Sequence, residues 1–291
     1  HRKNEFIFHI EHTMTLKIVD SQYTHLQCIF LSVNTVFNVF LKGVTFANCT
    51  QLKGNLVHIE SAFINIVHIS KCDFISNAVQ RYNHLHDIWG VIYIKQGNDL
   101  TEYFSEFENN TELNTSDTAE ITEINEMITN DSREMNSELH NKFGALVIIN
   151  CTHFAGNAIY NIRGGGIIAT NIKKILLINS VYQYKFGQEG IAGIFKNIGD
   201  IFIDNCVFFK NKQSLESYHK FPGVVTIKSA RTSMIKRCTV KNNVISSGAS
   251  FFIEEVSKVH FIDNVCKHNI YTDTEEFAVA IHVQKSSNVT I

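Results

Sequence analysis

The chain has 291 residues, of which 44% are hydrophobic and 19% charged, and its formal net charge is −2. This apolar content excludes a disordered chain and is sufficient for one large core or two ordinary ones. The longest apolar stretch, residues 29–46, is interrupted by Asn34, Asn38 and Lys42, so the sequence contains no candidate for a membrane-spanning helix. The chain begins at His1 with no signal sequence, and we expect a processed protein or a fragment of a longer chain.

Short β-branched strands that follow a glycine recur along the chain, at residues 54–59, 90–94, 164–168, 223–227 and 248–253. The glycines at 193, 223 and 248 are separated by 30 and 25 residues. The chain contains one proline. This scarcity is typical of strands paired on both edges, because each residue of such a strand needs its N–H for the ladder.

A second sequence motif follows these strands. It consists of an isoleucine, then a cysteine or serine, an aromatic residue two positions later, and an asparagine. Copies occupy residues 69–77, 149–157, 178–182 and 203–211, with weaker copies at 235–243 and 262–266. A unit of three short strands cannot bury its apolar face alone, whereas stacked units share one continuous core. The sequence therefore predicts an all-β fold, a right-handed parallel β-helix (a solenoid) of about nine coils, forming a single domain over residues 1–291.

Three columns of side chains are predicted to stack from coil to coil. Asparagines at the turns tolerate left-handed φ and can hydrogen-bond between coils, while the thiols and rings would point inward. A disulfide between Cys206 and Cys238 is geometrically possible on adjacent coils. The turn column comprises Asn150, Asn179, Asn205 and Asn264; the thiol column comprises Cys72, Cys151, Cys206 and Cys238, with Ser180 substituting once; the aromatic column comprises Phe74, Phe154, Tyr182 and Phe208, followed by Val240.

Residues 98–141 differ in composition from the rest of the chain. They contain 12 Asp or Glu and a single basic residue, Arg133, which gives this segment a net charge of −11 and the remainder +9. A block of like charges repels itself and needs a partner to become compact. We interpret the segment as an acidic loop inserted in one coil; alternatively it folds back on the basic body or binds a cation.

The repeats resemble those of pectin-lyase-like right-handed β-helices. The combination of Gly-Gly-x-Ile at 165–168 with Phe-x-x-Asn at 74–77, 154–157 and 208–211 is similar to polymorphic outer-membrane-protein-type repeats and to large surface proteins of protists. The resemblance covers about residues 40–291 without the acidic segment. It implies a β-helix and an extracellular or cell-surface location, but it says little about activity because the repeated residues are structural.

The same superfamily contains polysaccharide lyases and hydrolases, so we searched the outward positions of the glycine-led strands for catalytic carboxylates. These positions hold His58, Tyr93, Thr226 and Phe252, and none of them can serve as one of the two acids of glycoside hydrolysis. The sequence has no zinc-binding or nucleotide-binding motif. We therefore expect no enzyme activity, no cofactor, no metal and no nucleic-acid partner.

Charged residues near the later repeats have two interpretations. Asp204 and Asp263 would share a column with Lys236 between them, as a structural charge ladder. Arg231, Lys236 and Arg237 form a basic cluster that is either solvated surface or a contact for an anionic sugar.

Six Asn-x-Ser/Thr sequons are candidates for N-glycosylation. From these and the resemblance we expect a non-catalytic structural or adhesive module of an extracellular or cell-surface glycoprotein, acting as spacer, adhesin or filament subunit. Its partners would be further repeats or other copies of the protein end to end, and glycans. The alternative is a polysaccharide lyase or hydrolase, or a carbohydrate-binding module, acting on anionic glycans. The candidate sequons are Asn48, Asn109, Asn114, Asn130, Asn150 and Asn288.

Overall fold

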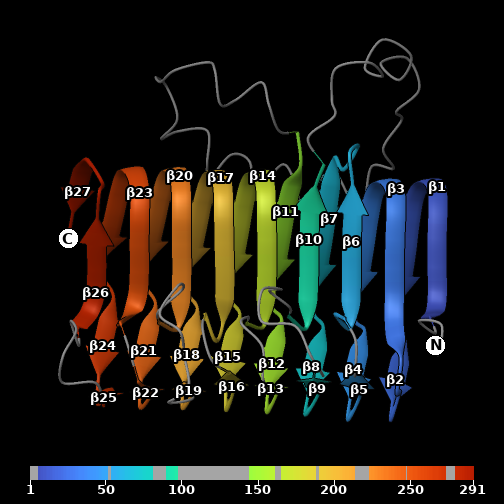
Figure 1. Ribbon diagram of the computed structural model, residues 1–291, viewed down its shortest axis with the longest axis horizontal. Helices are drawn as coiled ribbons and strands as arrows, with labels where there is room; N and C mark the ends of the chain where they lie inside the picture. Colours follow the sequence, from blue (N-terminus) through green and yellow to red (C-terminus); the bar gives the residue numbers. More distant parts are fainter. Residues whose placement is uncertain are drawn as a thin grey trace.

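The computed structural model describes residues 6–51, 54–80, 90–97, 144–160, 165–187, 190–213, 223–246, 248–272 and 279–291. Every secondary-structure element in these ranges is a β-strand. All pairings between the strands are parallel, and the coils succeed one another along a single axis (Figure 1). The predicted all-β parallel solenoid is confirmed.

Each coil contributes to three sheets, which we call the long sheet, the short sheet and the third sheet. The long sheet comprises β1 (Phe6–Val19), β3 (Ile29–Lys42), β6 (Val57–Ser61), β7 (Ile66–Ser70), β10 (Ile92–Gln96), β11 (Leu146–Asn150), β14 (Ile167–Ile178), β17 (Gly193–Asp204), β20 (Val225–Lys236), β23 (Ala249–Ile262), β26 (Val279–Gln284) and β27 (Asn288–Thr290). The short sheet comprises β2 (Gln22–Thr24), β4 (Thr45–Ala47), β8 (Asp73–Ile75), β12 (His153–Ala155), β15 (Val181–Gln183), β18 (Val207–Phe209), β21 (Thr239–Lys241) and β24 (Val265–Lys267). The third sheet comprises β5 (Thr50–Gln51), β9 (Ala78–Gln80), β13 (Ala158–Tyr160), β16 (Phe186–Gly187), β19 (Lys212–Gln213), β22 (Val244–Ile245) and β25 (Ile270–Tyr271).

The number of coils is slightly smaller than predicted. The short sheet has eight strands and the third sheet seven. Within the described residues, fewer coils contribute to all three sheets than the expected number of about nine. The difference arises because the first and last rows of the long sheet have no counterpart in the third sheet.

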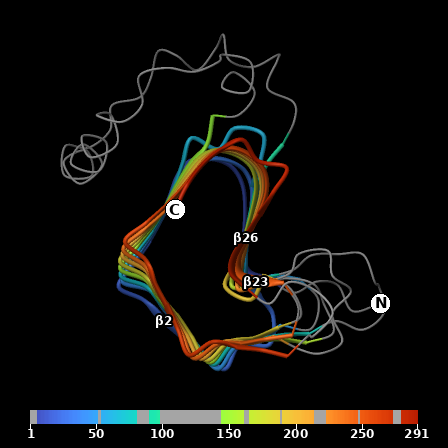
Figure 2. The same ribbon diagram turned by 90° about the vertical axis from the view of Figure 1, so that its left-hand side faces the viewer.

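Single residues in the left-handed region turn the chain at up to three places in a coil. One is a bend inside the long sheet, where Asn171 and Asn197 have φ of 60° and 55°. The second lies between the long and short sheets, and the third between the short and third sheets. The superposed outlines in Figure 2 show that these corners coincide from coil to coil.

The predicted acidic insertion, residues 98–141, lies outside the described residues. Its attachment points are defined: β10 ends at Gln96 and β11 begins at Leu146. Both pair with β14, β10 with its first half and β11 with its second. The described residues that flank this segment therefore lie at the bend of the long sheet.

The core is a continuous column of inward side chains. Alternate residues of the long sheet face inward; in β17, for example, Ile201 and Ile203 are fully buried. At both ends of the solenoid the column meets solvent: Phe8 of β1 is 39% exposed and Val289 of β27 is 43% exposed. The interior thus consists of equivalent layers with apolar ends.

Candidate functional site

The aromatic column runs through the interior of the short sheet. Strand register places Phe74, Phe154, Tyr182 and Phe208 directly above one another. Their ring centroids are 4.9–5.1 Å apart with interplanar angles of 8–12°, and all four are buried. Phe46 extends the stack by another coil. Offset aromatic pairs contribute about 0.5–1.5 kcal/mol each beyond the burial of their area, so the column stabilises the coil register as well as the core.

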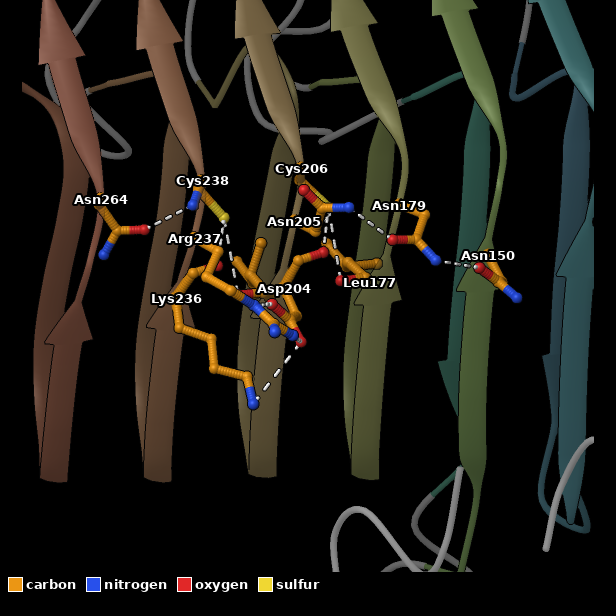
Figure 3. Close-up of polar contacts among 11 residues, drawn as sticks. Asn150, Leu177, Asn179, Asp204, Asn205, Cys206, Lys236, Arg237, Cys238 and Asn264 are labelled. Carbon is orange, nitrogen blue, oxygen red and sulfur yellow. Dashed lines mark hydrogen bonds and ion pairs between the residues drawn. The ribbon is translucent and has the colours of Figure 1, made fainter. Parts of the chain in front are cut away.

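The inward column at the corner between the long and short sheets holds small hydrogen-bond donors. The structure places Cys72, Cys206 and Cys238 there, all buried, with Ser180 between them as predicted. The thiol of Cys206 contacts the carbonyl oxygen of Leu177 one coil earlier at 3.4 Å (Figure 3). Burial raises the pKa of the Cys206 thiol, so it stays protonated. Cys206 and Cys238, the pair that could have formed a disulfide, are free thiols.

Cys151 lies outside this column, which differs from the prediction. Asn150 pairs with Ile178, and His153 with Val181, so Thr152 is the residue level with Ser180. Thr152 is buried and its hydroxyl donates to Ile69 one coil earlier at 3.4 Å. Cys151 takes the left-handed position instead, with φ of 49°, and is exposed.

The turn asparagines occupy three registers rather than the one predicted. Asn179 and Asn205 both have left-handed φ, and the Asn205 amide donates to Asn179 Oδ1 at 2.8 Å (Figure 3). Asn150 lies one residue earlier in the coil, yet its Oδ1 still accepts from Asn179 at 3.4 Å. Asn264 lies one residue later, in the inward column, where it accepts from the Cys238 N–H at 2.8 Å. The strand pairing sets the register of the coils. Any residue that accepts the left-handed conformation can therefore occupy the turn position.

An arginine interrupts the exposed ladder. Arg237 follows Asn205 in the left-handed column, with φ of 54°, and its guanidinium makes a bidentate ion pair with Asp204. Lys236 Nζ lies 3.6 Å from the same carboxylate (Figure 3). Asp263 is level with Arg237 and not with Asp204, because Asp204, Lys236 and Ile262 pair in register. The predicted Asp204–Lys236–Asp263 ladder therefore does not form.

The predicted basic cluster is largely neutralised by carboxylates of the preceding coil. Arg231 is paired with Asp200, its Nε lying 2.9 Å from Oδ1, while Lys236 and Arg237 share Asp204. Two carboxylates thus offset two of the three positive charges.

A buried asparagine ladder, which the column assignment missed, occupies the inner corner between the short and third sheets. The Oδ1 atom of each asparagine accepts from the backbone N–H of the corner residue one coil earlier, at 2.9–3.0 Å for Asn157, Asn243 and Asn269. Each side-chain amide donates in turn to the carbonyl of the aromatic-column residue one coil earlier, as Asn157 does to Phe74 at 2.8 Å. The Phe-x-x-Asn motif in the sequence was the signal for this ladder. The members are Asn77, Asn157, Asn211, Asn243 and Asn269.

Lys185 replaces asparagine in the middle of this ladder. It lies between Asn157 and Asn211, is only 2% exposed, and its Nζ has no hydrogen-bond partner among the described residues. The Nζ sits 4.5 Å from the centroid of the Phe154 ring. Burial lowers the pKa of Lys185 to about 7. Lysine has no acceptor, so it cannot bond the N–H of Asn157 as an asparagine would, and the ladder is divided in two.

A group of interacting titratable side chains on the outer face of the long sheet lies on β6 and β10; a second group joins Lys228 and Lys285 to Glu254. The His58 and Tyr93 rings stack at 4.9 Å, and Lys95 Nζ lies 2.5 Å from Glu60. Burial lowers the pKa of His58 and raises that of Tyr93, while the bond to Glu60 raises the pKa of Lys95. Within the described ranges, no group of three or more His, Cys, Asp or Glu residues is placed to hold a metal ion.

Three of the six sequons lie in the described residues. Asn48 and Asn288 are exposed, whereas Asn150 is half-buried and its amide oxygen belongs to the exposed ladder. The other three, Asn109, Asn114 and Asn130, lie outside the described residues.

Comparison with known proteins gives no family for the chain. No family model, no curated protein and no solved structure matches it. In the part of the chain that the structure describes, no helix has the length and apolar character required to cross a membrane.

Removing one ring from the aromatic column tests its contribution. We expect Phe154→Ala to lower the free energy of unfolding by about 3–5 kcal/mol, because it leaves a cavity between two stacked neighbours. Phe209→Ala is the matched control, since Phe209 is half-exposed on the outer face of the same sheet, and it should cost about 1 kcal/mol or less. Urea unfolding followed by circular dichroism measures both; equal losses would contradict the assignment.

Restoring the ladder asparagine should stabilise the protein. At pH 7 we expect Lys185→Asn to raise the free energy of unfolding by about 1–3 kcal/mol, because it supplies the missing acceptor and removes a buried amine. Lys185→Met removes the amine without supplying the acceptor and should gain less.

The same variants test the titration of Lys185. Its folded pKa of about 7 lies below its usual 10.5, so between these values the unfolded chain binds a proton that the folded chain does not. Wild-type stability therefore rises from pH 7 towards 10.5 by this contribution, which both variants should lack. A pH profile of unfolding unchanged by either substitution would contradict the burial of a neutral amine.

Proposed function

We propose that the chain is a non-catalytic structural or adhesive β-helical module of an extracellular or cell-surface glycoprotein. The observation that carries the proposal is the use of its polar side chains: the buried asparagines, hydroxyls and thiols bond to backbone groups of the next coil. On the outer face, His58, Glu60, Tyr93 and Lys95 are engaged with one another. Side chains committed in this way stabilise a rod.

The resemblance to pectin-lyase-like and polymorphic outer-membrane-protein-type repeats supports the same proposal. On this resemblance the module would serve as a spacer, adhesin or filament subunit at an extracellular or cell-surface location. The exposed sequons at Asn48 and Asn288 are compatible with glycosylation at the two ends of the rod.

The ends of the solenoid support end-to-end association with further repeats or with other copies. In the described residues β1 pairs only with β3, so its other edge presents unpaired backbone groups. Apolar side chains accompany these edges: Val19 is 52% exposed at one end, and Ile291 is 78% exposed at the other. A parallel edge with apolar flanks is the surface on which another coil would stack.

Charging the first coil should abolish association of the 291-residue chain. We expect the wild type to form dimers or longer species at micromolar concentration, and the double variant Phe8→Lys/Val19→Lys to sediment as a monomer. Tyr184→Lys is the control, because Tyr184 is 51% exposed on the side of the rod, and it should associate as the wild type does. Sedimentation velocity over a concentration series measures this; a wild type monomeric at all concentrations would contradict end-to-end stacking.

A further inference from the structure

The corner between the short and third sheets carries a row of lysines on its outer side. Lys241 and Lys267 are paired neighbours on successive coils, and Phe209 precedes them in the same column. Lys210 lies beside Phe209 at the left-handed corner, and Lys212 begins the next strand. We call Lys210, Lys212, Lys241 and Lys267 the lysine corner. Three of the four are exposed and Lys241 is half-exposed.

The lysine corner has no carboxylate to neutralise it among the described residues. In the short sheet, the third sheet and the corner between them, the only described carboxylate is that of Asp73. Asp73 lies on β8, three strands away from β18 in the short sheet, and is 3.6 Å from His153. The cations at the other corner are different, since Arg237 and Lys236 meet Asp204. The lysine corner is therefore a group of cations with no described carboxylate beside it, whereas Lys236 and Arg237 share one.

Aromatic rings hold these ammonium groups in place. Lys210 Nζ lies 5.4 Å from the ring centroid of Tyr184 and 5.0 Å from that of Phe209, and Lys241 Nζ lies 5.0 Å from the Phe209 ring on its other side. At an exposed site such contacts contribute only about 0.5–1 kcal/mol, less than a hydrogen-bonded carboxylate can offer. The lysines are thus positioned in advance and remain able to receive anions.

The chain itself contains a segment of matching charge. Residues 98–141 have 12 carboxylates and one arginine, a net charge of −11, against +9 for the rest of the chain. We propose that this acidic segment binds the lysine corner of its own molecule. Because the two are covalently joined, the effective concentration of the segment is on the order of millimolar, at which weak charge pairs suffice.

The length of the segment allows this contact. Between Gly97 and Gly144 the chain has 46 residues, so its middle can extend roughly 75 Å from the attachment points. Within one coil, Gly144 is followed by the corner residue Gly156 after 12 residues, a path of roughly 40 Å along the surface. Two to four further coils add roughly 10–20 Å along the axis. The proposal goes beyond the structural role and does not depend on it.

Lysine footprinting on the full chain tests the contact. The protein is acetylated with limiting reagent at 50 mM salt, at a concentration where it is monomeric, and each lysine is quantified by mass spectrometry. We expect Lys210, Lys241 and Lys267 to react at least threefold faster in a variant whose 12 carboxylates in 98–141 are changed to Asn or Gln than in the wild type. Lys42 and Lys71 are exposed controls at the corner between the long and short sheets, away from the attachment points of the segment, and should react equally in both proteins.

Two further measurements keep the test decisive if that variant is unstable. Raising the salt to 500 mM should remove the protection in the wild type, since exposed charge pairs are screened. Zero-length carbodiimide coupling should join segment carboxylates to the lysine corner within one chain. The proposal is overturned if the corner lysines react in the wild type as fast as in the variant, if the control lysines are protected to the same extent, or if couplings map to other lysines.

Discussion

Every coil of the solenoid must satisfy the backbone N–H and C=O groups at its corners, where strand pairing stops. A buried backbone group without a partner costs about 1–3 kcal/mol, and a coil has up to three corners. The chain meets this constraint with side chains from the adjacent coil: an amide, hydroxyl or thiol from one layer bonds the backbone of the next. Because each bond joins residues 26 to 83 positions apart, the ladders define the register of the coils as well as their stability.

The buried asparagine ladder shows what this arrangement demands. An asparagine at the inner corner both accepts from an N–H and donates to a carbonyl, so it satisfies two groups with one side chain. Neighbouring asparagines are then linked through their amides, for example Asn211 to Asn243 at 2.9 Å. The Lys185 side chain is long enough to reach into the same space, but it can only donate hydrogen bonds and cannot accept one. The asparagine ladder is interrupted at the coil that contains Lys185, and the cation–π contact with Phe154 compensates in part.

Much of this fold can be read from the sequence because the repeated unit is short and its hydrophobic period is regular. The glycine-led strands, the aromatic column and the inward positions of Cys72, Cys206 and Cys238 follow from the spacing alone. The displacement of Cys151 was missed although the spacing contains it: Cys72 and Cys206 lie two positions before their aromatic residues, whereas Cys151 lies three before Phe154. The strand pairing accordingly places Thr152 in the thiol column. The partners of the charged residues were hidden: Asp200 and Arg231 are 31 positions apart and meet because two coils superpose. Left-handed corners formed by Lys71, Arg237 or Glu255 have no sequence signature, since the fold imposes that conformation on residues that do not prefer it.

Cross-linking between coils tests the central claim most directly. Ile75 and Ala155 are 80 positions apart in the sequence but are direct partners on β8 and β12, with side chains on the outer face. In a Cys151→Ser background, the double variant Ile75→Cys/Ala155→Cys should form an intramolecular disulfide on mild oxidation, because parallel partners about 4.8 Å apart fall within the range that a disulfide spans. The variant Ile75→Cys/Gln183→Cys, two coils apart, should stay reduced. Equal oxidation of both pairs, or of neither, would contradict the stacking of these coils in the described register.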